Sequence, residues 1–278
     1  MIMVTGAQGQ LASLALQELA ERKVPALGGS RTPATGQRHL DFEDPESLDL
    51  TGVATLVLVS AGYAEDDRVV ARHRAVLDAA VRDGVRHVVY TSLTGGGDHL
   101  GFALAHRATE RMIKASGLGW TLLRNGLYAE LFGALLTWSA DGSADTLESP
   151  FGDGALSAVA RADLAAAAAV VAGDPTAHAG RTYELVGEPI TATDVAERLG
   201  VAHHTISLGA YRARLLADDS LLPFQPPMLT SIATGVRHGY LGDTGPGLVR
   251  LLGRPLTDPL TVASDTAAAI RPVLRRCG

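Results

Sequence analysis

The sequence predicts a doubly wound α/β fold, in which helices cover both faces of a parallel β-sheet. An apolar strand at residues 2–4 runs into Gly6 and Gly9, and a helical pattern follows at once. Apolar strands and helices then alternate, with connections short enough for right-handed crossovers. The strand at 55–60 is apolar throughout, as expected of a strand that is covered on both faces.

In the first half, the elements follow this alternation closely. After the first helix, residues 24–27 (VPAL) form a second predicted strand, and the next elements are a strand at 55–60, a helix at 69–82, a strand at 87–92, a helix at 105–116 and a strand at 120–125. The helix at 69–82 has one broad face made of Val69, Val70, His73, Val76, Leu77, Ala80 and Val81. Gly117 ends the helix at 105–116.

In the second half, the alternation is less regular. Strands are expected at 155–160 and 181–187, with a helix beginning at 161 between them. A helix in 190–200 has Thr191 or Thr193 available as its N-cap. From residue 203 on, proline and glycine cluster, which predicts short, loosely organised helical elements over the main sheet.

Composition narrows the function classes. The chain has 278 residues and a formal net charge of −6, which argues against a surface that binds nucleic-acid phosphates. No segment is apolar for long enough to cross a bilayer, and a strand that starts at Ile2 leaves no room for an export signal, so we expect a soluble cytoplasmic protein. The single cysteine, Cys277, excludes an internal disulfide, and no metal-ligand pattern is present, so we expect no metal.

The glycine turn indicates an anion site. Such a turn points the free N–H groups at the start of a helix toward whatever lies above the strand. Gly6, Gly9 and Ala12 form a G-x-x-G-x-x-A pattern in the first βα unit, where doubly wound sheets bind dinucleotides. An ordinary tight turn explains the two glycines by themselves, but their place in the fold favours a dinucleotide.

The end of the second strand distinguishes the two nicotinamide dinucleotides. An acid there binds the ribose 2′-hydroxyl and repels a 2′-phosphate. The stretch LGGSRTP contains no acid, whereas Ser30 offers a hydroxyl and Arg31 a forked cation, so NADP(H) is favoured over NAD(H). A solvated loop arginine is the alternative for Arg31. Asp41 and Phe42 could border the adenine, although a surface turn explains them almost as well.

The carboxyl ends of the central strands supply the other candidates, because ligands of such sheets bind there. The full set of predicted cofactor-binding residues is Gly6, Gln8, Gly9, Gln10, Leu11, Ser30, Arg31, Asp41, Phe42, Ser60, Ala61, Gly62, Tyr90, Thr91 and Ser92. Ser92 or Tyr128 can donate a hydrogen bond to a developing oxyanion. Asn125, Tyr128 and Phe102 are the predicted substrate-binding residues, whereas the position of Tyr90 in an apolar strand favours a core residue.

Several segments together resemble the NmrA-like atypical short-chain dehydrogenases, and among them the type 2 NAD(P)H:quinone oxidoreductases. They are MIMVTGAQGQL, SRTP, HVVYTSL, HRATERMIKASG, WTLLRNGLYAE, ARADLAAAAA, TYELVG and LLGRP, and they extend over nearly the whole chain. The resemblance implies a Rossmann fold with a smaller, discontinuous C-terminal region and NADPH-dependent reduction of quinone-like or conjugated substrates. His106 matches the motif of this family, which implies that it holds the nicotinamide or the substrate; a helix histidine bonded to a neighbouring carbonyl is an equally good interpretation.

The sequence departs from that family at three places, and the last two bear on the substrate. Gln8 stands where a threonine is usual, Arg111 where a lysine is usual, and the loop at 94–102 is unusually rich in glycine. Lysine occurs only at 23 and 114, and no tyrosine has a lysine four residues later, so simple ketone reduction is disfavoured. A quinone is less demanding, because hydride addition gives a hydroquinone anion with a pKa of about 10 that solvent can protonate.

These observations lead to one predicted function. We expect residues 1–150 to form a dinucleotide-binding Rossmann core, and residues 151–278 to combine the remaining sheet elements with a smaller substrate-binding region. The expected activity is NADPH-dependent hydride transfer to a small aromatic or quinone-like acceptor, with Tyr128, Ser92 and His106 as catalytic candidates. The alternatives are an NADP(H)-binding redox sensor without turnover and an enzyme that modifies a polycyclic aromatic metabolite. The sequence leaves a homodimer open.

Overall fold

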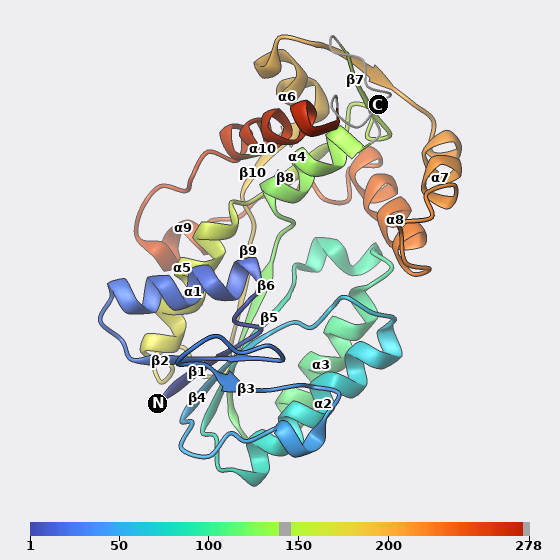
Figure 1. The fold of residues 1–278 in the computed structure, drawn as a ribbon. Helices are drawn as coiled ribbons and strands as arrows, with labels where there is room; N and C mark the ends of the chain where they lie inside the picture. Colours follow the sequence, from blue (N-terminus) through green and yellow to red (C-terminus); the bar gives the residue numbers. More distant parts are fainter. Residues whose placement is uncertain (139–145, 275–278) are drawn as a thin grey trace.

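A seven-stranded parallel sheet forms the centre of the molecule and confirms the predicted fold class (Figure 1). The structure is a computed structural model that describes residues 1–138 and 146–274. The strand order is β3-β2-β1-β4-β5-β6-β9. The strands are β1 (Ile2–Thr5), β2 (Ala26–Ser30), β3 (Arg38–His39), β4 (Thr55–Val59), β5 (His87–Leu93), β6 (Gly119–Asn125) and β9 (Arg181–Leu185). The order reverses between β1 and β4, which is where such sheets bind dinucleotides.

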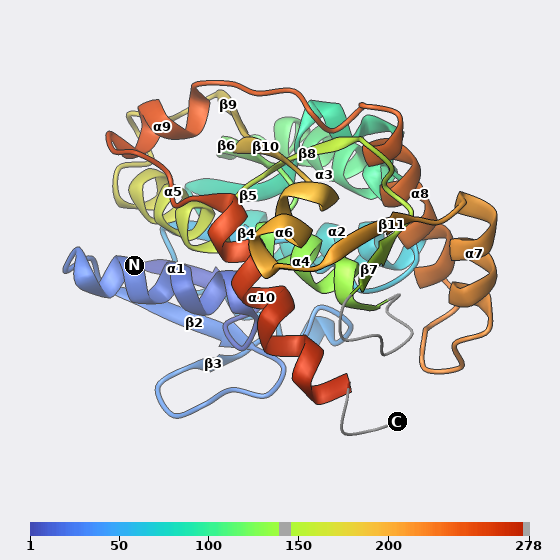
Figure 2. The same cartoon turned by 90° about the horizontal axis from the view of Figure 1, so that it is seen from above.

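Helices cover both faces of this sheet (Figures 1 and 2). One face packs against α1 (Gln10–Glu21), α5 (Arg161–Gly173) and α9 (Gly247–Leu252), and the buried core there includes Leu11 and the alanine-rich side of α5. The other face packs against α2 (Asp66–Arg82) and α3 (Ala103–Ala115), where Tyr90 is among the largest fully buried side chains. A short 3-10 turn, η1 (Pro45–Ser47), lies between β3 and β4.

A second region sits beyond the carboxyl edge of the sheet (Figure 1). It contains α4 (Ala129–Trp138), α6 (Ala192–Leu199), α7 (Leu208–Leu216), α8 (Gln225–Arg237) and α10 (Pro259–Leu274). Two small two-stranded sheets belong to it, one of β8 (Ala155–Ala158) with β10 (Glu188–Thr191) and one of β7 (Thr146–Ser149) with β11 (Ala202–Thr205). Its own apolar core packs α4 against α10. Because α5, β9 and α9 return to the main sheet, this region is discontinuous in sequence; the boundary at residue 150 stays a prediction.

The second strand differs from its predicted position. It was expected at 24–27, but β2 runs from Ala26 to Ser30, so Gly28 and Gly29 lie inside the strand and pair with Val4 and Thr5. Close packing explains the glycines, because a Cβ at Gly28 would lie 2.7 Å from the Cβ of Ala7 in the glycine turn. The absence of a side chain at Gly28 therefore lets β2 pack closely against the glycine turn.

The second half also departs from expectation. The strand expected at 155–160 is shorter and pairs antiparallel with β10 outside the main sheet. Thr191 is the N-cap of α6, in a capping box with Asp194. The expectation of only short elements after residue 203 was wrong, since α8 has 13 residues and α10 has 16. Prolines 226 and 227 lie in the first turn of α8. The N–H groups of a first turn have no partner within the helix, so proline, which lacks an N–H group, costs no hydrogen bond there.

Two features bear on the function classes. Within residues 1–138 and 146–274, no helix is long and apolar enough to cross a membrane. The same residues contain no group of three or more histidine, cysteine or acidic side chains that could hold a metal. Cys277 lies outside the described residues.

Candidate functional site

The glycine turn after β1 presents backbone N–H groups that no side chain caps. Gly6 has a φ of +67°, a left-handed conformation that favours glycine, and the N–H of Gly9 donates to the carbonyl of Gly6 at 2.7 Å. Gly9 is the N-cap of α1, and neither a capping side chain nor an acid occupies the first turn of this helix. A Cβ at Gly9 would lie 3.1 Å from the Gly6 oxygen. The turn is therefore a small cradle with unneutralised N–H groups, which suits a pyrophosphate.

Side chains at the carboxyl ends of β1 and β2 frame this cradle. The amide of Gln8 donates to the side-chain oxygen of Gln37 at 2.9 Å, which links the glycine turn to the loop after β2. Ser30 is buried at the end of β2, while Arg31 is exposed and forms no ion pair with any described residue. Gln10 is exposed at the start of α1. Arg31 is therefore a cation without an ion-pair partner among the described residues, and it follows the strand next to the glycine turn.

Asp41 and Phe42 follow β3 at the same edge. An Asp41 carboxylate oxygen accepts from the backbone N–H of Glu43 at 3.0 Å, and the Phe42 ring is partly buried against the core under α2. The structure therefore brings these residues to the side of the sheet that carries the glycine turn. Their contact with an adenine stays a prediction.

His106 and Tyr90 form a pair between α3 and β5, in which Tyr90 is fully buried and His106 is partly buried. The Tyr90 hydroxyl lies 2.9 Å from Nδ1 of His106, and the ring of Phe102 packs edge-on against His106 with 6.3 Å between ring centres. Burial lowers the pKa of His106 to about 4, and burial raises the pKa of Tyr90. Both side chains are therefore neutral near pH 7. Nε2 of His106 has no hydrogen-bond partner among the described residues, which leaves it available to a ligand.

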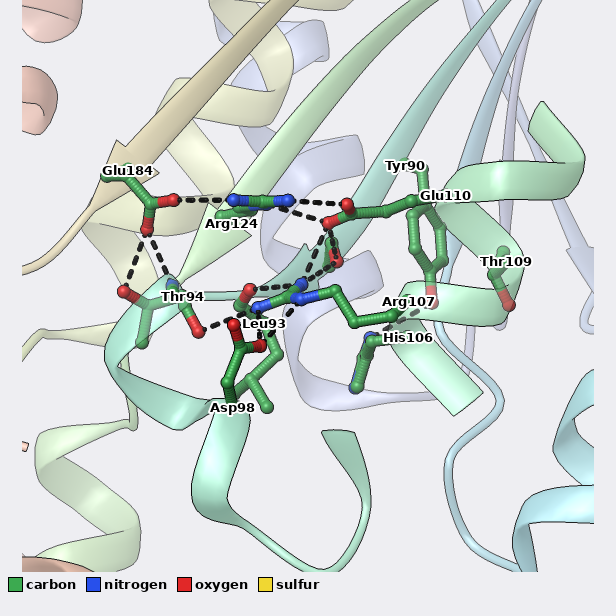
Figure 3. Close-up of polar contacts among 12 residues, drawn as sticks. Tyr90, Leu93, Thr94, Asp98, His106, Arg107, Thr109, Glu110, Arg124 and Glu184 are labelled. Carbon is green, nitrogen blue, oxygen red and sulfur yellow. Dashed lines mark hydrogen bonds and ion pairs between the residues drawn. The ribbon is translucent and has the colours of Figure 1, made fainter. Parts of the chain in front are cut away.

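A polar cluster lies beside this pair, at the carboxyl ends of β5, β6 and β9 (Figure 3). Its centre is Glu110 of α3, a buried carboxylate that pairs with Arg124 at 2.7 and 2.8 Å and with Arg107 at 2.9 Å. Burial alone would raise the pKa of Glu110, but the two guanidinium groups and a hydrogen bond from Ser92 outweigh it and lower the pKa. Glu110 is therefore ionised, and its buried charge is compensated.

The polar cluster extends to the glycine-rich loop. Glu184 on β9 accepts from Arg124 at 3.1 Å, and its other oxygen accepts from the Thr94 hydroxyl and the Gly95 N–H, both at 2.9 Å. Arg107 donates to the carbonyls of residues 93 and 94 and to Asp98 in η2 (Gly95–His99). Figure 3 shows Arg124 between Glu110 and Glu184. The loop at 94–99 is thus attached to α3, β6 and β9 through charged side chains.

Ser92 belongs to the polar cluster. Its buried hydroxyl donates to Glu110 at 2.6 Å, which engages its single proton. The sequence had offered Ser92 as an oxyanion donor and a cofactor contact. Because the proton is directed at Glu110, the geometry does not favour Ser92 as an oxyanion donor.

Asn125 and Tyr128 close the site on the β6 side. Asn125 is buried, and its side-chain oxygen has no hydrogen-bond partner among the described residues, which is uncommon for a buried polar atom. Tyr128 packs with its ring under the guanidinium of Arg161, 4.6 Å from the ring centre, and burial raises its pKa. Residues 60–62, at the end of β4, lie between these groups and the glycine turn in strand order.

Sequence reasoning missed the carboxylates of the polar cluster, Glu110 and Glu184. Glu110 falls on the buried side of α3, together with Thr109 and Ile113, so an acid on an apolar helix stripe was the available signal. Glu184 lies on the edge strand β9, and nothing in the local sequence shows that it reaches the loop at 94–99. Its role depends on the pairing of β9 with β6, which joins distant parts of the chain.

The chain is similar to known NAD(P)H-binding proteins. The model of a family described as NAD(P)H-binding matches residues 6–175. The quinone oxidoreductase 2 of Escherichia coli strain K12 is 34% identical over 282 residues, which cover 92% of this chain and 95% of that protein. An NmrA-like family domain-containing oxidoreductase of Aspergillus flavus, flvB, is 34% identical over 182 residues, covering 59% of this chain and 58% of the relative.

Solved structures share the whole architecture. The triphenylmethane reductase of Citrobacter sp. in complex with NADP(H) superposes with a TM-score of 0.84 at 29% identity, covering 96% of this chain and 99% of that chain. The E. coli NADPH-dependent quinone oxidoreductase in complex with NADPH gives a TM-score of 0.82 at 32% identity, covering 95% and 99%. Both similarities extend beyond the main sheet to the second region.

Proposed function

Because the chain belongs to the NAD(P)H-binding family, we propose that it is an NADPH-dependent oxidoreductase that transfers a hydride to a quinone or a related aromatic acceptor. The relatives named above support this proposal, since the E. coli protein and the Citrobacter enzyme are reductases crystallised with NADPH or NADP(H). The observation that carries the proposal is the glycine turn, whose α1 N-terminus has no capping side chain and lies on the same sheet edge as His106.

The residues present fit the dinucleotide. A Cβ at Gly9 would narrow the cradle, and the absence of an acid in the first turn of α1 leaves its N–H groups for the pyrophosphate. Arg31 would contact the 2′-phosphate, with Ser30, Asp41 and Phe42 around the adenosine half. Gln8, Gln10 and Leu11 would line the pyrophosphate, and residues 60–62 and Thr91 the nicotinamide half. Bound NADPH supplies a hydride.

The acceptor side suits a flat aromatic molecule. Phe102 and Tyr128 provide rings, and Asn125 provides a buried amide whose oxygen lacks a partner. His106 would donate a hydrogen bond from Nε2–H to the acceptor oxygen as negative charge develops there. In that tautomer, the Tyr90 hydroxyl would donate to Nδ1. A hydroquinone anion has a pKa of about 10, so solvent can complete the protonation. The second region beyond the sheet edge would cover this acceptor.

The test measures both binding and turnover. Purified protein is mixed with NADPH and a panel of benzoquinones and naphthoquinones, and the nicotinamide absorbance is followed. We expect quinone-dependent oxidation of NADPH, with kcat about 100-fold lower in His106→Phe, since one oxyanion donor is removed. His204→Ala changes an exposed histidine of the second region and should match the wild type. Tight NADPH binding without reduction of any acceptor would reject the reductase and leave the redox sensor.

A further inference from the structure

Three consecutive backbone N–H groups at the end of β4 are each bound by a side chain from a different element. The N–H of Val59 donates to the Thr5 hydroxyl at 3.0 Å, and that of Ser60 donates to the Thr91 hydroxyl at 3.0 Å. The N–H of Ala61 donates to Nε2 of His73 at 3.0 Å. These acceptors come from β1, β5 and α2, so the segment is held from three directions.

The sheet itself cannot supply these bonds. β1 ends at Thr5, and its pairing with β4 stops at Val4 and Val57, so Val59 lies beyond the last β1 partner. The pairing of β4 with β5 stops at Val59 and Thr91. A backbone N–H beyond the ladder needs another acceptor when it is buried. The side chains of Thr5, Thr91 and His73 therefore continue the hydrogen bonding of β4 past the end of the strand.

The proton positions around His73 follow from this arrangement. A backbone N–H can only donate, so Nε2 of His73 must accept from Ala61, and the ring proton must lie on Nδ1. Nδ1–H then donates to the Thr109 hydroxyl at 2.8 Å, and that hydroxyl donates to the carbonyl of Ala105 at 2.8 Å. Each polar hydrogen of this chain has one acceptor, so only one arrangement satisfies every group.

His73 is also in the right state to serve as an acceptor. It is completely buried, as are Thr5 and Thr109, and burial lowers the pKa of His73 to about 3. The imidazole therefore stays neutral at any ordinary pH. The guanidinium of Arg72 donates to the carbonyl of Ala61 at 3.2 Å, so the peptide groups on both sides of this residue are fixed.

We propose that His73, with Thr5 and Thr91, is a positioning residue that holds residues 59–61 in the orientation the nicotinamide half of the dinucleotide requires. The inference rests on the proposed cofactor. In a doubly wound sheet, the second mononucleotide half binds over the strands beyond the switch point, and β4 is the first of these. A small displacement there would move the hydride donor relative to the acceptor, and hydride transfer is sensitive to such displacement.

A role in stability alone makes a different prediction. In that case, removing His73 would lower the melting temperature, and the kinetics of the surviving folded enzyme would be unchanged. Val76 lies on the same helix and is equally buried, but it makes no polar contact with residues 59–61. Val76→Ala is therefore the matched control, because it damages the packing of α2 and leaves the three hydrogen bonds in place.

The experiment compares His73→Leu, His73→Gln and Val76→Ala, each assayed at the same interval below its own melting temperature. We expect kcat for quinone reduction to fall about 10-fold and the Kd for NADPH to rise about fivefold in His73→Leu, since positioning affects both. His73→Gln, which can accept from Ala61 and donate to Thr109, should recover most of the loss. Val76→Ala should retain wild-type kcat and Kd.

Thr5→Val is the second variant, in case His73→Leu fails to fold. Valine has nearly the shape of threonine but cannot accept from Val59, and Thr5 is not among the predicted cofactor contacts. We expect the same direction of change as in His73→Leu, with a smaller size. One outcome overturns the positioning role and leaves the proposed function standing. In it, the wild type binds NADPH, and the variants His73→Leu, Thr5→Val and Val76→Ala all retain the wild-type kcat and Kd. If the wild type binds NADPH but reduces nothing, the reductase fails and the Kd comparison still decides the inference.

Discussion

The glycine turn above β1 and the polar cluster around Glu110 occupy the same edge of one sheet, yet they treat polar groups in opposite ways. In the glycine turn, the first N–H groups of α1 have no capping side chain and no nearby acid. In the polar cluster, Glu110, Arg124, Arg107 and Glu184 compensate one another through ion pairs. The glycine turn therefore keeps hydrogen-bond donors available, whereas the charges of the polar cluster pair with one another.

This difference indicates that the glycine turn serves to bind a ligand and that the polar cluster serves to stabilise the fold. Free backbone donors at a helix N-terminus have little to lose when an anion binds, because no internal partner must be displaced. Charges that are already paired have little capacity for a ligand, but removing the buried Glu110 takes away the carboxylate that two partly buried guanidinium groups share. We therefore expect changes in the polar cluster to act mainly on stability and changes in the glycine turn to act mainly on affinity.

The largest expected effect comes from Glu110→Ala. Arg124 and Arg107 would each lose a buried carboxylate, and we expect the free energy of unfolding to fall by about 3–5 kcal/mol. Urea denaturation followed by circular dichroism measures this change. Glu43→Gln is the control, because Glu43 pairs with Arg68 and Arg72 on the surface, where such pairs contribute little. An equal loss of unfolding free energy in the two variants would contradict the stabilising role of the polar cluster.

Gly9→Asp should show the reverse behaviour. An aspartate at this N-cap can accept from the first turn of α1, so the melting temperature should not fall, but its charge and its Cβ would occupy the cradle. We expect the Kd for NADPH to rise about 100-fold, or about 2.7 kcal/mol. Isothermal titration calorimetry measures the affinity, with Gly209→Asp in the first turn of α7 as a distant control. Unchanged affinity would remove the dinucleotide from this turn.

Arg31→Ala should have the smallest effect of the three. Arg31 is exposed, so we expect a loss of about 1.5 kcal/mol in NADPH binding, which is the lower range for a hydrogen bond to a charged group. NADH binding should be unchanged, because NADH lacks the 2′-phosphate. Calorimetry with both nucleotides makes the comparison. If the wild type binds NADPH and NADH equally well, Arg31 does not select the cofactor.

The sequence was informative where function depends on local patterns. The strand, the glycine turn and the helix at residues 2–21 were predictable because each lies next to the other in the chain. The central strands β4, β5 and β6 were predictable from their continuous apolar runs. The predicted second strand stopped at residue 27, because the side chains that leave no room for a Cβ at Gly28 and Gly29 are those of Ala7 and Leu40, which are remote in sequence.

The hydrogen bonds that hold the site in place were much harder to predict. The bonds from Thr5, Thr91 and His73 to residues 59–61 depend on where β1 and β5 stop relative to β4. That register is a property of the assembled sheet, and a histidine on an apolar helix stripe does not reveal it. Ser92 illustrates the same limit, since a hydroxyl at a strand end looks available until its partner, Glu110, is known.

The return of β9 to the main sheet has a consequence for folding during synthesis. β9 pairs with β6, although residues 126–180 separate them in the chain. While the chain emerges from a ribosome, β6 keeps an unpaired edge and Arg124 lacks its second carboxylate until Glu184 has been made. An exposed strand edge of this kind can pair with other chains. The nascent protein therefore passes through a stage in which its nucleotide-binding half is nearly complete but open to aggregation, and the arrival of one short edge strand ends it.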